Sequence, residues 1–291
     1  MSAEARWEIG GLELIILQTS DAFRYSGMLR ETSRTAIEYA RRHGFVYESF
    51  IGIKRGQIGA HAAFNRILML DELVDRGFRG WALYMDADAY VKDLSFDLRA
   101  YLADKAQYSA IMATIPGETI AWHINSGVLF FNLEHPMGIA LVKEWKRRFM
   151  SVSDDELGRV QSVWDGVNDQ TMLYESLDRN IELRENVLFV EPQLFNHHEG
   201  RFIRQLLNSL DGNIDSRTAK IAIAVATVLN ETKGETDVVD SLYRIILNRP
   251  ADAGSSGYAD LINAKGMADG IPEVVKYLLD SEEYASRVRS Q

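Results

Sequence analysis

The chain has 291 residues, no cysteine, 42 acidic against 32 basic residues, and a formal net charge of -10. The lack of cysteine excludes disulfides and thiolate metal sites, and the negative charge disfavours a nucleic-acid partner. No stretch approaches the roughly 20 apolar residues of a transmembrane segment. Residues 1–11 show no secretory signal pattern, so a cytoplasmic location is expected.

The first 90 residues alternate between strand-like and helix-like segments. Short apolar or β-branched runs predict strands at 12–17, 45–53 and 81–85. Apolar residues at helical spacing, each followed by a glycine, predict helices at 26–43 and 60–76. This order predicts an α/β fold with a doubly wound, mostly parallel sheet that binds ligands beyond the carboxyl ends of its strands.

The rest of the chain divides near residue 200. Before it, strands are expected at 108–114, 127–132 and 186–191, and helices at 138–150 and 168–177. After Gly200 the strand pattern stops, and helices are expected at 202–210, 218–230 and within 237–288, with a polar boundary at 231–235. The predicted division is therefore a catalytic α/β domain 1–205, a helical connector 206–235 and a small all-α domain 236–291.

Two carboxylates follow directly on the apolar strand predicted at 81–85. If the strand geometry persists, alternation turns Asp86 and Asp88 to the same side. Two like charges so close repel and are costly to desolvate unless a cation joins them. Oxygen ligands suit Mg²⁺ or Mn²⁺, which keep positions open for substrate phosphates. A surface turn capped by acidic residues is the alternative.

A haloacid-dehalogenase-type phosphatase is a second alternative for the aspartate pair. Such enzymes carry Asp-x-Asp after a hydrophobic strand and use the first Asp as nucleophile. They usually place the motif on their first strand, followed by Thr or Val where this chain has Tyr90. The position of the pair, near residue 86, therefore disfavours this class.

Segment 60–93 resembles the centre of a GT-A glycosyltransferase. It is most similar to the galactosyl/xylosyltransferase family of yeast and plants, and more distantly to glycogenin-like enzymes. Three later segments resemble hallmarks of these families in the same order: the Asn-x-Gly strand at 123–132, the Asp-Gln helix start at 164–170 and the His-x-x-Gly motif at 197–200. The likeness covers roughly residues 12–205 and implies a metal-dependent glycosyltransferase.

The resemblance also implies a cation site and a diphosphate contact. Asp86, Asp88 and His197 would hold Mn²⁺ or Mg²⁺, although the adjacent His198 leaves the choice of histidine open. Arg66, on the helix before the metal strand, would reach the diphosphate or the donor sugar. The alternative is that Arg66 only solvates its helix face.

The donor is implied to be a UDP- or GDP-sugar, and the acceptor a glycan or another hydroxyl. Residues implied to bind the sugar nucleotide are Thr19, Ser20, Ala87, Asn125 and Gly127. Asp169 and Gln170 would face the reacting carbon of the sugar, and each of these positions has a purely structural alternative as a helix cap, strand bulge or turn.

The resembling families retain anomeric configuration, so a retaining transfer is expected. Front-face attack and a carboxylate intermediate on Asp169 both stay open. A non-catalytic scaffold that binds sugar nucleotides is the competing function.

The carboxy-terminal helices carry a second resemblance. Segments 237–250 and 278–284 are similar to a helical domain of unknown function in bacterial proteins, related to phycobilisome-linker repeats. This resemblance implies a possible protein partner and no catalysis. The eukaryotic glycosyltransferases carry an amino-terminal membrane anchor that is not seen here, so a bacterial, cytoplasmic enzyme is expected.

Overall fold

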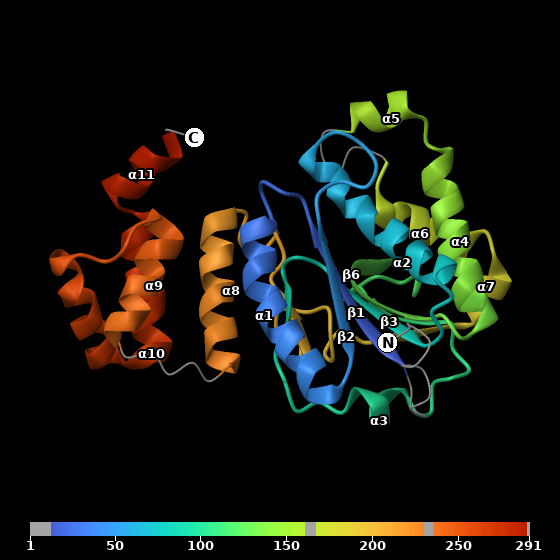
Figure 1. Ribbon diagram of the computed structural model, residues 1–291, viewed down its shortest axis with the longest axis horizontal. Coiled ribbons are helices and arrows are strands. Elements are labelled where there is room, and N and C mark those ends of the chain that lie inside the picture. Colours follow the sequence, from blue (N-terminus) through green and yellow to red (C-terminus); the bar gives the residue numbers. More distant parts are fainter. Residues whose placement is uncertain (1–12, 161–166, 230–234, 290–291) are drawn as a thin grey trace, which may run out of the picture.

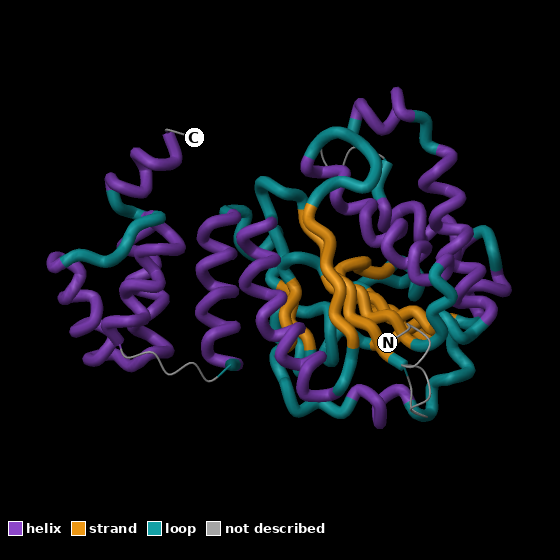
Figure 2. Tube along the Cα trace, viewed as in Figure 1, coloured by secondary structure: helices purple, strands orange, loops and turns teal. Residues whose placement is uncertain are grey.

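The computed structural model describes residues 13–160, 167–229 and 235–289. The centre of this described part is a six-stranded sheet with the order β2-β1-β3-β6-β5-β7, and helices cover both of its faces (Figures 1 and 2). β6 runs antiparallel to both of its neighbours and the other pairings are parallel. The strands of this sheet are β1 (Leu14–Ser20), β2 (Val46–Ile51), β3 (Trp81–Met85), β5 (Ala110–Thr114), β6 (Ile124–Asn132) and β7 (Val187–Val190). The predicted mostly parallel α/β fold is confirmed.

A second, two-stranded sheet pairs β4 (Ala89–Val91) with β8 (Ile203–Gln205). The helices of the α/β part are α1 (Ser26–His43), the 3-10 helix η2 (Gly59–Phe64), α2 (Asn65–Asp75), α3 (Leu98–Leu102), α4 (Pro136–Ser151), α5 (Asp154–Arg159), α6 (Asp169–Asp178) and α7 (Ile181–Glu185). The later helices are α8 (Ile214–Val228), α9 (Glu235–Leu247), the 3-10 helix η3 (Ala253–Ser255), α10 (Ser256–Leu279) and α11 (Glu282–Arg289).

Each face of the large sheet has its own apolar core, because side chains alternate along the strands. Ile15 of β1 packs with Trp145 in the core beneath α2, α4 and α6. Ile16 turns the other way and packs with Tyr39 of α1. All four side chains are buried, and full burial of each large apolar side chain contributes about 1.5–3 kcal/mol. The sheet is therefore held rigidly between its two helix layers.

The end of α1 lies where the sequence predicted it. Gly44 takes a left-handed conformation with φ of 66°, and its N–H donates to Ala40 O. Glycine adopts this conformation without the steric cost of a Cβ. The predicted helix at 60–76 is divided instead, because its first turn is the 3-10 helix η2 and α2 begins only at Asn65.

The helix predicted at 202–210 is wrong, since this segment contains β8. β8 pairs antiparallel with β4, and Phe202 and Ile203 are fully buried beside α1. Ladder hydrogen bonds to β4 and burial on the sheet side outweigh the local helical pattern. β6 also begins at Ile124, earlier than the predicted 127. Residues 164–166 of the Asp-Gln hallmark, and most of the boundary predicted at 231–235, lie outside the described residues.

α8 lies between α1 and the helices α9–α11 (Figure 1). Its Ile221 and Val225 pack with Met28 of α1, whereas Ala219 belongs to the core of the carboxy-terminal helices. The hydroxyl of Tyr284 in α11 donates to Asp215 Oδ2 of α8 at 3.2 Å. The division of the chain into 1–205, 206–235 and 236–291 stays a prediction. Among the described helices, none has the length and apolar character needed to cross a membrane.

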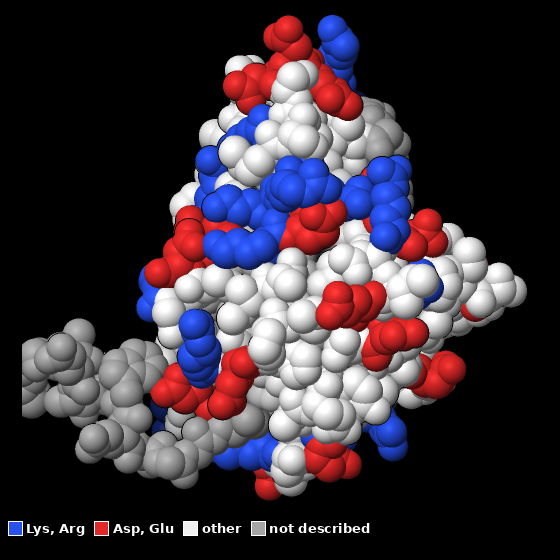
Figure 3. All heavy atoms as spheres, turned by 90° about the vertical axis from the view of Figure 1, so that its right-hand side faces the viewer, with Lys and Arg blue, Asp and Glu red and all other residues white. Residues whose placement is uncertain are grey.

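The basic side chains on the α4 side of the molecule lie among acidic ones (Figure 3). Lys143 and Lys146 of α4 both pair with the buried Asp71 of α2. Arg147 and Arg148 pair with Glu144 on the same helix. These bases are therefore neutralised by partners within the protein and do not form a uniformly positive surface.

Candidate active site

A cavity of about 790 Å³ opens beyond the carboxyl ends of β1 and β3. This is the edge at which the sequence predicted ligand binding. The predicted residues that line the cavity are Thr19, Ser20, Arg66, Asp86, Ala87, Asp88, Asn125, Asp169, Gln170 and His197. His198 instead lines a separate cavity of about 150 Å³. Side chains from six separate parts of the chain therefore meet at one place.

The two aspartates reach the cavity through a turn. β3 ends at Met85, Asp86 N donates to Gly127 O at 2.7 Å, and Ala89 N donates to Asp86 O at 3.0 Å. Asp86 to Asp88 thus form the tight connection from β3 into β4. The expected convergence of the carboxylates is present, but it results from this turn and not from strand alternation.

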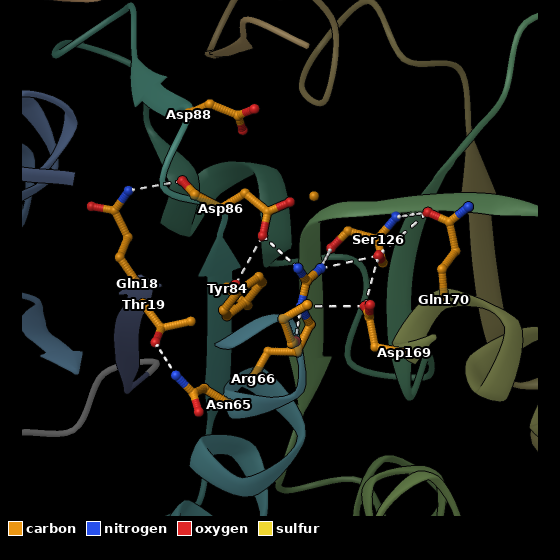
Figure 4. Close-up of polar contacts among 12 residues, drawn as sticks. Gln18, Thr19, Asn65, Arg66, Tyr84, Asp86, Asp88, Ser126, Asp169 and Gln170 are labelled. Atoms are coloured by element: carbon orange, nitrogen blue, oxygen red, sulfur yellow. Dashed lines mark hydrogen bonds and ion pairs between the residues drawn. The ribbon is translucent and has the colours of Figure 1, made fainter. Parts of the chain in front are cut away.

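Arg66 organises the floor of the cavity (Figure 4). Its Nη2 donates to Asp86 Oδ1 at 2.6 Å and its Nη1 donates to Ser126 O at 2.6 Å. Its Nε lies 3.4 Å from Asp169 Oδ2. The ring of Tyr84 lies 4.7 Å from the guanidinium, and the Tyr84 hydroxyl donates to Asp86 Oδ1 at 2.9 Å. Arg66 therefore neutralises and orients two carboxylates, and it does not merely solvate its helix.

Burial makes ionisation of the aspartate pair unfavourable. It is the largest cause that raises the pKa of Asp86 to about 7; Arg66 offsets part of this effect, while Asp88 and Asp169 add to it. Burial also raises the pKa of Asp88. The side chains keep 25% and 13% of their surfaces exposed, respectively. A cation between the carboxylates would remove this penalty.

Gln205 bridges the two carboxylates. Its Nε2 donates to Asp88 Oδ1 at 2.9 Å and to Asp86 Oδ2 at 3.3 Å. A Cβ on Gly127 would lie 2.2 Å from this Nε2, so only glycine leaves room for the amide. Gly127 itself does not line the cavity, and its contribution here is space for Gln205. Gln205 is not among the predicted site residues, because the sequence pattern predicts a helix over 202–210.

Asn125 connects Gln205 to the neighbouring loop. Its Nδ2 donates to Gln205 Oε1 at 3.3 Å, and its Oδ1 accepts from Gly127 N at 3.0 Å. Asn196, in a left-handed conformation with φ of 68°, donates from Nδ2 to Asn125 O at 2.6 Å. These contacts fix the wall that carries the neighbouring His197.

Asp169 and Gln170 begin α6 and both contact Ser126. Ser126 Oγ donates to Asp169 Oδ2 at 3.1 Å, and Ser126 N donates to Gln170 Oε1 at 3.0 Å. The side chain of Asn168 caps the helix by accepting from Thr171 N at 2.7 Å. The cap of α6 is therefore Asn168. The side chains of Asp169 and Gln170 do not cap the helix and line the cavity.

His197 is held by its own loop. Its Nδ1 accepts from Glu199 N at 3.1 Å. Among the described residues, the cluster whose possible ligand atoms all lie within 4.8 Å of one another is His197, His198 and Glu199. Asp86 and Asp88 are outside that cluster, although they share the large cavity with His197. The three predicted metal ligands, Asp86, Asp88 and His197, thus line one cavity, but their ligand atoms do not form a cluster within 4.8 Å of one another.

Several polar atoms in the cavity wall are buried without a hydrogen-bond partner among the described residues. They are Ser20 Oγ, Asn196 Oδ1, and Nε and Nη1 of Arg217. Thr19 differs from Ser20, since its Oγ1 donates to Phe50 O at 2.8 Å. Buried polar atoms are usually paired, and leaving one unpaired costs about 1–3 kcal/mol. Unpaired donors and acceptors in one cavity wall indicate a polar ligand.

Comparisons with known proteins identify the fold. No protein-family model matches the chain, and no curated protein matches it. A solved structure of a glycosyltransferase involved in the glycosylation of the major capsid of PBCV-1 aligns with a TM-score of 0.53 at 16% identity, over 72% of this chain and 98% of that one. The chain has the fold of that glycosyltransferase. The GT-A-type fold expected from the sequence is therefore confirmed.

Two other solved glycosyltransferases align less closely. The galactosyltransferase LgtC, in complex with donor and acceptor sugar analogs, has a TM-score of 0.32 at 14% identity over 62% of this chain and 74% of that one. A Drosophila β-1,4-galactosyltransferase 7 mutant, in complex with manganese, UDP-Gal and xylobiose, has a TM-score of 0.38 at 12% identity over 68% and 72%.

Proposed function

We propose that this protein is a metal-dependent glycosyltransferase that moves a sugar from a nucleoside-diphosphate sugar to the hydroxyl of a glycan or another acceptor. The observation that carries the proposal is the 790 Å³ cavity, which combines a partly buried aspartate pair with unpaired polar atoms at the carboxyl edge of the sheet. The fold shared with a known glycosyltransferase supports it. The cytoplasmic location and bacterial origin stay predictions.

The donor atoms of the site fit a hard divalent cation. Asp86 and Asp88 offer carboxylate oxygens whose ionisation is disfavoured without a counter-charge, and His197 lines the same cavity. Asp86 and Asp88 would hold Mn²⁺ or Mg²⁺, and His197 is proposed as a further ligand from the wall of the same cavity. The cation would offset charge on the diphosphate leaving group.

The transfer requires one bond to break and one to form at the anomeric carbon. The bond from this carbon to the phosphate oxygen breaks, and its electron pair stays on the diphosphate. The acceptor oxygen bonds to the carbon, and its proton passes to the departing diphosphate or to solvent. Asp169 and Gln170 would border the donor sugar, while Thr19 and Ser20 would receive the nucleoside. Retention of configuration is proposed from the family resemblance.

Calorimetry with UDP- and GDP-sugars, in the presence and absence of MnCl₂, tests the function. Wild-type protein is expected to bind either the UDP-sugars or the GDP-sugars, to require Mn²⁺ for this binding, and to hydrolyse the bound donor slowly. Asp88→Asn should lower donor hydrolysis by about 100-fold or more, because the cation contributes several kcal/mol. Asp104→Asn removes an exposed acid away from the cavity and is the matched control.

Two results would contradict the proposal. If the Asp88→Asn variant binds the donor with unchanged affinity, the assignment of the cation site to Asp86 and Asp88 is wrong. Cation-dependent binding with no turnover of any donor, with or without sugar acceptors, would instead favour a non-catalytic scaffold that binds sugar nucleotides.

A further inference from the structure

An arginine from α8 forms part of the cavity wall. Arg217 is 1% exposed, yet it lines the cavity together with Asp88 and Tyr25. α8 follows the segment 12–205 that carries the sequence resemblance. A helix outside that segment therefore contributes a buried positive charge to the site.

The contacts of Arg217 hold the guanidinium in place but do not use all of its hydrogen-bond donors. Nη2 donates to the Tyr25 hydroxyl at 3.1 Å, and the guanidinium carbon lies 5.5 Å from the Tyr25 ring centroid. Nη1 lies 3.6 Å from Asp88 Oδ2, which is too long for a hydrogen bond. Nε and Nη1 have no hydrogen-bond partner among the described residues. Two donors are therefore buried and unused.

A purely structural ion pair would have a different geometry. Arginine and carboxylate groups that only stabilise each other usually form parallel hydrogen bonds of about 2.7–2.9 Å. Asp88 Oδ1 instead accepts from Gln205, and its Oδ2 stays at a distance from Arg217. The unused donors fit a ligand that carries several anionic oxygens. Phosphate groups match the planar fork of arginine.

We propose that Arg217 binds the diphosphate of the donor and stabilises the charge that this group gains when the sugar leaves. The inference rests on the proposed glycosyltransferase function. In the transfer, the electron pair of the broken carbon–oxygen bond stays on a phosphate oxygen. Arg217 donates hydrogen bonds to the diphosphate and transfers no proton. The side chain is thus a catalytic residue supplied by α8.

The carboxy-terminal helices support α8, so the role of Arg217 has to be tested in the full chain. The side chain of Asn213 accepts from Ser216 N at 2.9 Å and so caps α8, and Tyr284 of α11 contacts both Asn213 and Asp215. The carboxy-terminal helices therefore hold the first turn of the helix that carries Arg217. A shortened chain would change this support together with the arginine.

The experiment compares wild type with Arg217→Gln, Arg217→Lys and the control Lys220→Gln. Lys220 is an exposed base on the same helix that pairs with Asp211. Calorimetric titrations use MnCl₂ alone, then inorganic pyrophosphate, UDP and GDP in the presence of MnCl₂. Circular dichroism verifies that each variant is folded. Donor hydrolysis is measured in parallel.

Arg217→Gln is expected to bind pyrophosphate and the preferred nucleoside diphosphate about 10- to 100-fold more weakly, because charged hydrogen bonds are lost. Its affinity for Mn²⁺ alone should not fall, since a positive neighbour of Asp88 has been removed. Arg217→Lys keeps the charge but not the fork and should lose about 3- to 10-fold. Lys220→Gln should match wild type.

Failure of this inference is distinguishable from failure of the proposed function. If wild type binds and hydrolyses a donor while folded Arg217→Gln does so equally well, only the role of Arg217 is overturned. If Arg217→Gln does not fold, unchanged diphosphate affinity in folded Arg217→Lys overturns it. If wild type binds no nucleoside diphosphate with Mn²⁺, the proposed function and the role of Arg217 both fall.

Discussion

Gly127→Ala should disrupt the aspartate pair without touching either aspartate. The new Cβ would lie 2.2 Å from Gln205 Nε2 and 2.4 Å from its Oε1, far inside contact distance. Gln205 is 2% exposed, and its amide is held in place by hydrogen bonds to Asp86 and Asp88. Overpacking of this kind lowers the free energy of unfolding by about 1–3 kcal/mol. The displaced amide would also leave its position between Asp86 and Asp88, so donor affinity should fall.

A double-mutant cycle separates this mechanism from a general glycine effect. In a Gln205→Ala background the clash disappears, and Gly127→Ala should then cost less than about 0.5 kcal/mol. Urea unfolding followed by tryptophan fluorescence gives the four free energies. Gly27→Ala is the control, because its Cβ would meet no atom within 4 Å, and it should be neutral or slightly stabilising in α1. If the costs of Gly127→Ala and Gln205→Ala simply add, the steric explanation is wrong.

Three further results are expected. The pKa of Asp86 is raised to about 7, so the cation-free protein loses stability as the pH rises through 7 and this carboxyl ionises. The affinity for Mn²⁺ should increase about 25-fold from pH 5.5 to 7.5, because the cation binds the ionised carboxylate. Calorimetry that shows no pH dependence of Mn²⁺ binding would contradict this. Arg66→Met leaves the partly buried Asp86 and the buried Asp169 without their shared cation and should cost about 3–5 kcal/mol in urea unfolding. A cost below about 1 kcal/mol would refute the assigned role of Arg66. Tyr284→Phe removes the hydroxyl that joins α11 to α8 and should cost about 0.5–1.5 kcal/mol while the protein stays folded, as thermal unfolding would show.

The sequence predicted the parts of the fold that depend on local patterns. The helix at 26–43 was predicted with its observed bounds, since its apolar spacing and Gly44 both act within a few residues. The apolar run 81–85 was likewise predicted as β3. The aspartate pair could be recognised because two charges one residue apart after a buried strand require an explanation that local structure does not give.

β8 could not be predicted in the same way. Its residues carry no clear strand pattern, and they become a strand only because β4 offers a partner more than 100 residues away in the chain. The local pattern therefore predicts a helix, and Gln205 could not be assigned to the site from sequence. One sequence pattern does point to Arg217, since this charged residue lies on the apolar face of α8 that carries Ile214, Ile221 and Val225.

The sequence by itself determined the alternation of strands and helices, the apolar faces that form the two cores, and the chemistry of Asp86 and Asp88. These properties follow from hydrophobic periodicity and from charge, which act over short distances along the chain. The tertiary structure alone decided which groups surround the aspartates. Gln205 reaches Asp86 across 119 residues and Arg217 reaches Tyr25 across 192. Such contacts exist only after strand pairing and helix packing have brought distant segments together.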